Sequence, residues 1–90
     1  MFKIWAKIMK EEKIVKSIVY EDLSTFEVDN FFEYLSNICH TLDLATPILL
    51  AKHVYQYVAF RNTSFSKVDF PEEIFFDNLV LEDATNFDKK

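Results

Sequence analysis

The first twenty residues alternate apolar and polar side chains with a period of two. In residues 2–9 one set of alternate positions is wholly apolar: Phe2, Ile4, Ala6 and Ile8. This period is that of a β-strand, in which successive side chains point to opposite faces. Residues 13–20 are rich in β-branched side chains and are the natural partner strand. The pattern therefore predicts an N-terminal β-hairpin.

The turn of this hairpin, residues 10–13, contains neither glycine nor asparagine. We therefore expect a loose type I connection or a β-bulge rather than a tight type I′ turn. The simplest pairing places Met9 opposite Ile14 and Trp5 opposite Ile18. That register predicts an aromatic face fringed with lysine, which is typical of an interaction surface. Its expected members are Trp5, Met9, Ile14, Ile18, Tyr20, Lys3, Lys7 and Lys16.

Two helices are predicted between residues 24 and 60. Ser24 and Glu27 form a capping-box pattern that would begin the first helix. Thr46 and Pro47 mark the start of the second, because proline is favoured at the first helical position. The predicted apolar stripe of helix one is Val28, Phe32, Leu35, Cys39 and Leu42, broadened by Phe31 and Ile38. That of helix two is Leu50, Val54, Tyr57 and Val58.

The position of Phe32 in the middle of the first stripe predicts a loss of about 3 to 5 kcal/mol on truncation to alanine.

The remainder of the chain is less regular. Residues 61–70 are predicted to be a loop with an extended end at 67–70, residues 71–73 one helical turn, and residues 76–82 a strand. The expected fold is a single α+β domain over residues 1–84, followed by a frayed tail at 85–90. It is a two-layer sandwich in which an antiparallel or mixed sheet of three or more strands packs on a helical hairpin.

Composition narrows the class of protein. Half of the 90 residues are apolar, which suits a packed domain, and there is no glycine. Without glycine a phosphate-binding loop is excluded, and positions with positive φ are expected at Asn62 and Asn78. No leader or long apolar run occurs, and the single cysteine forms no internal disulfide, so we expect a cytoplasmic protein without membrane association.

The net charge of −5 is unevenly distributed. Residues 1–20 hold five lysines and two glutamates, whereas residues 21–90 hold five basic and thirteen acidic residues. Attraction between the basic hairpin and the acidic body explains this pattern more simply than a dedicated binding patch.

Candidate chemistry is sparse. His40, Asp43 and His53 are residue types that bind zinc, but their spacing matches no metal motif. Cys39 and His53 could pair as nucleophile and base, yet no third residue or oxyanion loop accompanies them. We therefore predict a protein that is not an enzyme and uses no metal or cofactor, with Cys39 as a buried thiol.

Residues 37–54, NICHTLDLATPILLAKHV, resemble the helix-turn-helix of small DNA-binding regulators. Asp43 stands where that family has glycine, and the positions that would read bases offer only Lys52, His53 and Gln56. The resemblance implies a degenerate helix-turn-helix over residues 37–61 and a nucleic-acid-binding regulator.

The acidic net charge favours a different function. We predict a small interaction or regulatory domain that forms a homodimer through the hairpin face, or binds another protein there, in preference to nucleic acid.

Overall fold

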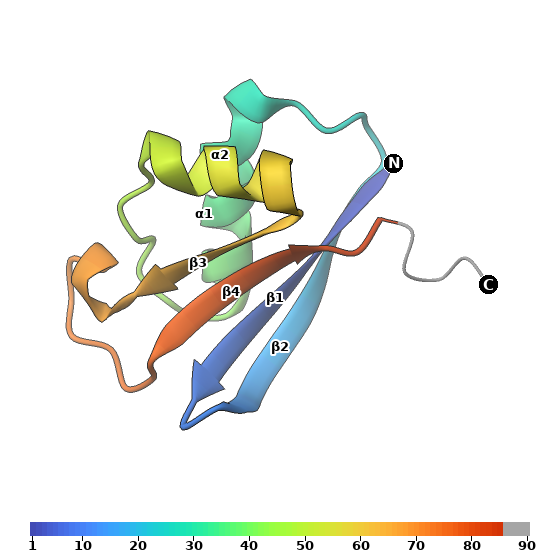
Figure 1. Cartoon of the computed structure of the whole chain (residues 1–90). Helices are drawn as coiled ribbons and strands as arrows, with labels where there is room; N and C mark the ends of the chain where they lie inside the picture. Colours follow the sequence, from blue (N-terminus) through green and yellow to red (C-terminus); the bar gives the residue numbers. More distant parts are fainter. Residues whose placement is uncertain (86–90) are drawn as a thin grey trace.

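The computed structural model describes residues 1–85 and has two layers (Figure 1). An antiparallel sheet with strand order β2-β1-β4-β3 forms one layer, and two helices on one of its faces form the other. The predicted α+β sandwich is confirmed. The elements in chain order are β1 (Phe2–Lys10), β2 (Lys13–Asp22), α1 (Phe31–Thr41), α2 (Ala51–Phe60), β3 (Asn62–Ser66) and β4 (Asn78–Asp83).

The hairpin of β1 and β2 contains a bulge. Met9 pairs with Ile14 as predicted, but Ile8 pairs with Lys16, so Val15 is the extra residue. Trp5 consequently pairs with Val19. The predicted pairing of Trp5 with Ile18 is wrong, because one inserted residue moves every later side chain of β2 to the other face.

The turn between these strands is tighter than predicted. Glu11 and Glu12 both have positive φ, 53° and 65°, and Lys10 pairs directly with Lys13. Two such residues define a type I′ turn, whose twist matches that of the strands. The Glu11 N–H donates to Asp77 Oδ2 at 2.8 Å, which anchors the turn to the loop before β4. The other positive φ values fall at Asp43 and Arg61 rather than at Asn62 and Asn78.

We expect the double substitution Glu11→Asn with Glu12→Gly to raise the free energy of unfolding by about 1 kcal/mol. Asn-Gly adopts this turn without the penalty that glutamate has at positive φ. Thermal melting should show an increase of about 4 to 8 °C in Tm. Glu11→Gln with Glu12→Gln is the control, since it removes both charges and keeps the strain. An equal rise in the control would attribute the gain to charge.

The fourth strand was not predicted. Residues 61–66 were expected to be a loop, but Asn62–Ser66 pairs with β4 as the outer strand β3. Residues 67–69 form a short 3₁₀ turn instead of an extended segment. Residues 71–73 do not form the predicted helical turn. Thr85 accepts a hydrogen bond from the Lys3 N–H at 3.2 Å. The rest of the predicted tail, 86–90, lies outside the described residues.

Helix α1 begins later than predicted, and its buried face is centred nearer to Phe31 and Ile38 than to Phe32. A 3₁₀ turn at Val28–Asn30 precedes it, and the Ser24 hydroxyl donates to Asp22 Oδ1 instead of capping a helix. Phe31 is buried, whereas Phe32 is 57 % exposed. The predicted core position of Phe32 is therefore wrong. The buried residues of α1 are Phe31, Tyr34, Leu35, Ile38 and Cys39.

Helix α2 also starts later, at Ala51, because residues 44–50 are irregular. Pro47 is buried in that connection and does not open the helix. His53 Nδ1 accepts a hydrogen bond from the Leu50 N–H at 2.9 Å, so the imidazole satisfies a donor at the helix start. Only His53 and Tyr57 of α2 are buried, and the predicted core positions Leu50 and Val58 are 46 % and 52 % exposed.

Candidate interaction surface

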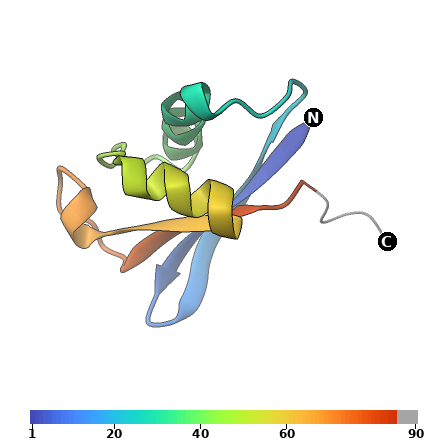
Figure 2. The ribbon, with the colours of Figure 1, turned by 45° about the horizontal axis from the view of Figure 1, so that its top comes forward.

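The face of the sheet opposite the helices is the candidate site. Both helices lie on the same side of the sheet (Figure 2). The buried residues of β1 are its even-numbered positions 2–8, so its odd-numbered side chains point to the opposite face. We call this surface the open face. Its members on the four strands are Lys3, Trp5, Lys7, Met9, Ile14, Ser17, Val19, Glu21, Asn62, Ser64, Ser66, Asn78, Val80 and Glu82.

This assignment corrects part of the predicted surface. Trp5, Met9, Ile14, Lys3 and Lys7 belong to the open face as predicted. Lys16, Ile18 and Tyr20 do not, because the bulge turns them toward the helices. Lys16 pairs with the buried Ile8, and Ile18 and Tyr20 pack against the core.

Sequence reasoning missed Ser17, Val19 and Glu21 of β2 and every member that comes from β3 and β4.

The centre of the open face is a fixed polar and aromatic cluster. Lys7 Nζ lies 4.3 Å from the centroid of the Trp5 ring and 2.7 Å from Glu82 Oε1. Trp5 and Glu82 are cross-strand neighbours, so both partners of Lys7 come from adjacent positions. The Lys7 side chain is only 16 % exposed. Its ammonium is held by an ion pair and a cation–π contact.

The apolar side chains surround this cluster. Ile14 and Val19 on β2 are 47 % and 58 % exposed, and Trp5, Met9 and Val80 are half-buried. Two lysines, Lys3 and Lys7, face two glutamates, Glu21 and Glu82, so the charges of the open face balance. A surface of this kind offers apolar contact without a net electrostatic field.

The residues considered for catalysis or metal binding are dispersed. Cys39 is fully buried in α1, His40 is exposed on the same helix, and Asp43 follows it at positive φ. His53 is buried in α2. Within residues 1–85, His, Cys, Asp and Glu side chains form no group of three or more that could hold a metal ion.

Cys39 is expected to react slowly with a thiol reagent in the native protein. Burial raises the pKa of this thiol to about 12, so little thiolate exists at neutral pH. Labelling with a chromogenic disulfide should accelerate at least about 100-fold in denaturant, because the thiol becomes accessible and its pKa returns to about 8.5. Fast labelling of the folded protein would contradict the buried position.

His53 links α2 to the 3₁₀ turn before the buried residue Phe70. Its ring lies 4.3 Å from that of Phe65, and its Nε2 lies 3.6 Å from Asp69 Oδ2. Burial lowers the pKa of His53, and the charge of Asp69 opposes only part of that shift. The neutral imidazole is therefore the form that suits the folded state.

The free energy of unfolding should consequently decrease as the pH falls below about 6.5, the unfolded pKa of histidine. In that range the unfolded chain binds a proton at His53 that the folded chain resists, whereas above it both states are neutral. Urea melts between about pH 7.5 and 5.5 should show a shallower decrease for His53→Gln than for the wild type. His40→Gln, which changes the exposed histidine, is the control. An unchanged pH dependence in His53→Gln would contradict the assignment.

The helix-turn-helix that the resemblance implies does not form. Nine residues separate the end of α1 at Thr41 from the start of α2 at Ala51, whereas that motif joins its helices by a turn of three or four. Of the candidate base-reading residues, His53 is buried. No helix among residues 1–85 is long and apolar enough to cross a membrane.

Comparison with protein-family models, curated proteins and solved structures finds no match to this chain.

Proposed function

We propose that this chain is a protein-interaction domain that binds a second copy of itself through the open face and does not turn over a substrate. The observation that carries the proposal is the open face itself, which no helix among residues 1–85 covers and which has Trp5, Met9, Ile14, Val19 and Val80 around a fixed lysine. Exposed apolar patches of this kind are characteristic of interaction sites.

The size of the open face suits a weak dimer. Four strands about 4.8 Å apart and about 25 Å long present roughly 480 Å². Two copies face to face therefore bury about 1,000 Å², which is the lower limit for a specific interface. We expect a dissociation constant of about 1 to 100 µM. The free energy gained by burying so small an interface exceeds the cost of association only slightly.

The charges of the open face favour a second copy over nucleic acid. A patch with only lysine would repel its own copy and attract phosphate. The open face instead has Lys3 and Lys7 with Glu21 and Glu82. A surface that carries both signs equally can pair with itself under two-fold symmetry.

Helix α2 presents a competing apolar surface. Tyr55 and Phe60 are 67 % and 63 % exposed, and their rings lie 6.3 Å apart. A ten-residue helix is only about 15 Å long and about 10 Å wide, so its outer face offers roughly 150 Å². This is less than a third of the open face, and the sheet surface is therefore the better candidate for a dimer.

Sedimentation equilibrium of the wild type tests this proposal. Between about 1 and 300 µM the mean mass should rise from 10.7 kDa toward twice that value, with Kd in the stated range. A mass of 10.7 kDa at every concentration would overturn self-association. Retention on a DNA column that salt abolishes would instead support nucleic-acid binding.

A further inference from the structure

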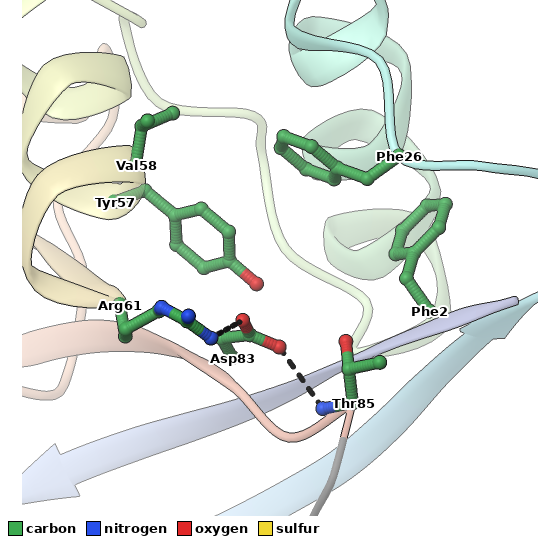
Figure 3. Close-up of a pocket in the computed structure, with 7 residues that line it drawn as sticks. All are labelled: Phe2, Phe26, Tyr57, Val58, Arg61, Asp83 and Thr85. Carbon is green, nitrogen blue, oxygen red and sulfur yellow. Dashed lines mark hydrogen bonds and ion pairs between the residues drawn. The ribbon is translucent and has the colours of Figure 1, made fainter.

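A pocket of about 270 Å³ lies on the helix side of the sheet, at the end of α2 (Figure 3). It is formed by segments far apart in the sequence: the start of β1, the chain before α1, the end of α2 and the end of β4. The lining residues that matter for binding are Phe2, Phe26, Tyr57, Arg61, Asp83 and Thr85.

One side of the pocket is an aromatic wall with fixed geometry. The Phe2 and Phe26 rings meet edge to face with centroids 5.3 Å apart, and Phe26 stacks on Tyr57 at 5.6 Å. Phe2 is only 4 % exposed, so its position is set by the core. Preformed aromatic walls of this kind suit a flat apolar ring.

The Tyr57 hydroxyl points into the pocket (Figure 3). Tyr57 is 95 % buried, and its hydroxyl has no hydrogen-bond partner among residues 1–85. Burial and the nearby Asp83 carboxylate raise the pKa of Tyr57, so the hydroxyl keeps its proton. The hydroxyl is accessible from the pocket and can therefore donate to an acceptor on a ligand there.

The polar end of the pocket has more donors than acceptors. Asp83 accepts from Arg61 Nη1 at 3.0 Å and from the Thr85 N–H at 2.9 Å. A guanidinium has five N–H donors, so Arg61 retains donors after this ion pair. Arg61 is held in position by its backbone, whose N–H donates to the Tyr57 carbonyl at 2.9 Å and whose carbonyl accepts from the Asp83 N–H at 2.8 Å.

We propose that this pocket binds a small molecule made of one apolar ring and an acceptor oxygen, either a carbonyl or a carboxylate. The ring lies against Phe2 and Phe26, and the oxygen accepts from Tyr57 and Arg61. The volume is just below the range of about 300 to 1,000 Å³ for drug-sized ligands, which limits the ligand to one ring with a short substituent. The site is on the side of the sheet away from the open face, so it does not rest on dimerisation.

Titration of the ¹⁵N-labelled protein with phenylacetamide and phenylacetate tests the site. Both should give saturable amide shifts at Val58, Arg61 and Thr85, with Kd of about 1 mM for ligands of this size. The 2-phenylethylammonium ion has the same ring without an acceptor and should bind at least about tenfold more weakly. Tighter binding of phenylacetate than of phenylacetamide supports the site as one for carboxylates, and equal binding supports it as one for carbonyls.

Two matched variants separate binding from stability. Tyr57→Phe removes the unpaired hydroxyl and should weaken phenylacetamide about tenfold while leaving Tm unchanged or higher. Tyr34→Phe removes an equally buried hydroxyl that accepts from the Glu27 N–H at 3.0 Å, so it should lower Tm by several degrees and leave the Kd within about twofold. Absence of saturable shifts at these amides up to about 20 mM, or wild-type affinity in Tyr57→Phe, would overturn the proposal.

Discussion

Replacing Phe31 with alanine is expected to cost about 3 to 5 kcal/mol of the free energy of unfolding. Phe31 is 1 % exposed, and its ring meets that of Tyr57 edge to face at 5.2 Å, so it joins α1 to α2. A small domain has a total stability of about 5 to 15 kcal/mol. The variant should therefore lose much of its cooperative unfolding transition or unfold at room temperature.

The neighbouring substitution Phe32→Ala is the matched control. Phe32 has the same side chain but is 57 % exposed, and its truncation should cost less than about 1 kcal/mol. Urea melts followed by circular dichroism compare the two variants with the wild type. A larger loss at Phe32 than at Phe31 would mean that α1 presents a face rotated by one residue.

The sequence pattern located α1 but not the face that it buries. Leu35, Cys39 and Leu42 are buried as the stripe predicts, whereas Val28 and Phe32 at its start are exposed. Val28 lies in the 3₁₀ turn before α1 and so does not follow the phase of the helix. Phe32 lies within α1, about 90° around the helix from the centre of its buried face, because that face is centred near Phe31 and Ile38. Apolar residues at 31 and 32 fit either phase, so spacing alone could not choose between them.

The sheet was predictable where its pairing is local. The hairpin follows from the alternation in β1. In β2, however, apolar residues occupy consecutive positions, including Ile18, Val19 and Tyr20, so the sequence does not show which of its two faces is buried. The pairing register could therefore be wrong by one residue. Strand β3, with the sequence NTSFS, has only Thr63 and Phe65 as inward positions, and such a polar outer strand resembles a loop.

The candidate site was half predictable for the same reason. Trp5, Met9 and Ile14 follow from the hairpin itself. Val80 and Glu82 come from β4, more than seventy positions after their β1 partners, and their place beside Trp5 and Lys7 depends on the strand order of the whole sheet. The charge balance of the open face therefore became visible only in three dimensions.

Two lysines introduced into the open face are expected to abolish most of the self-association. The double variant Trp5→Lys with Val19→Lys should weaken self-association by more than about 100-fold, because it places two charges in the centre of an apolar contact and each such position is worth about 2 kcal/mol or more. Val19 is chosen because it pairs with Trp5 on the open face, whereas Ile18 packs against the core.

The matched control introduces the same two lysines elsewhere. Tyr55→Lys with Phe60→Lys alters the most exposed aromatic pair of α2, on the other side of the sheet. Circular dichroism and thermal melting of both double variants should show that each remains folded. This step separates loss of an interface from loss of the fold.

Sedimentation equilibrium of the wild type and both double variants over the same concentrations is the most direct test of the open face as the contact surface. We predict a micromolar Kd for the wild type, a value within about threefold of it for the α2 variant, and a Kd at least about 100-fold weaker for Trp5→Lys with Val19→Lys. A folded open-face variant that still dimerises with the wild-type Kd would contradict the account.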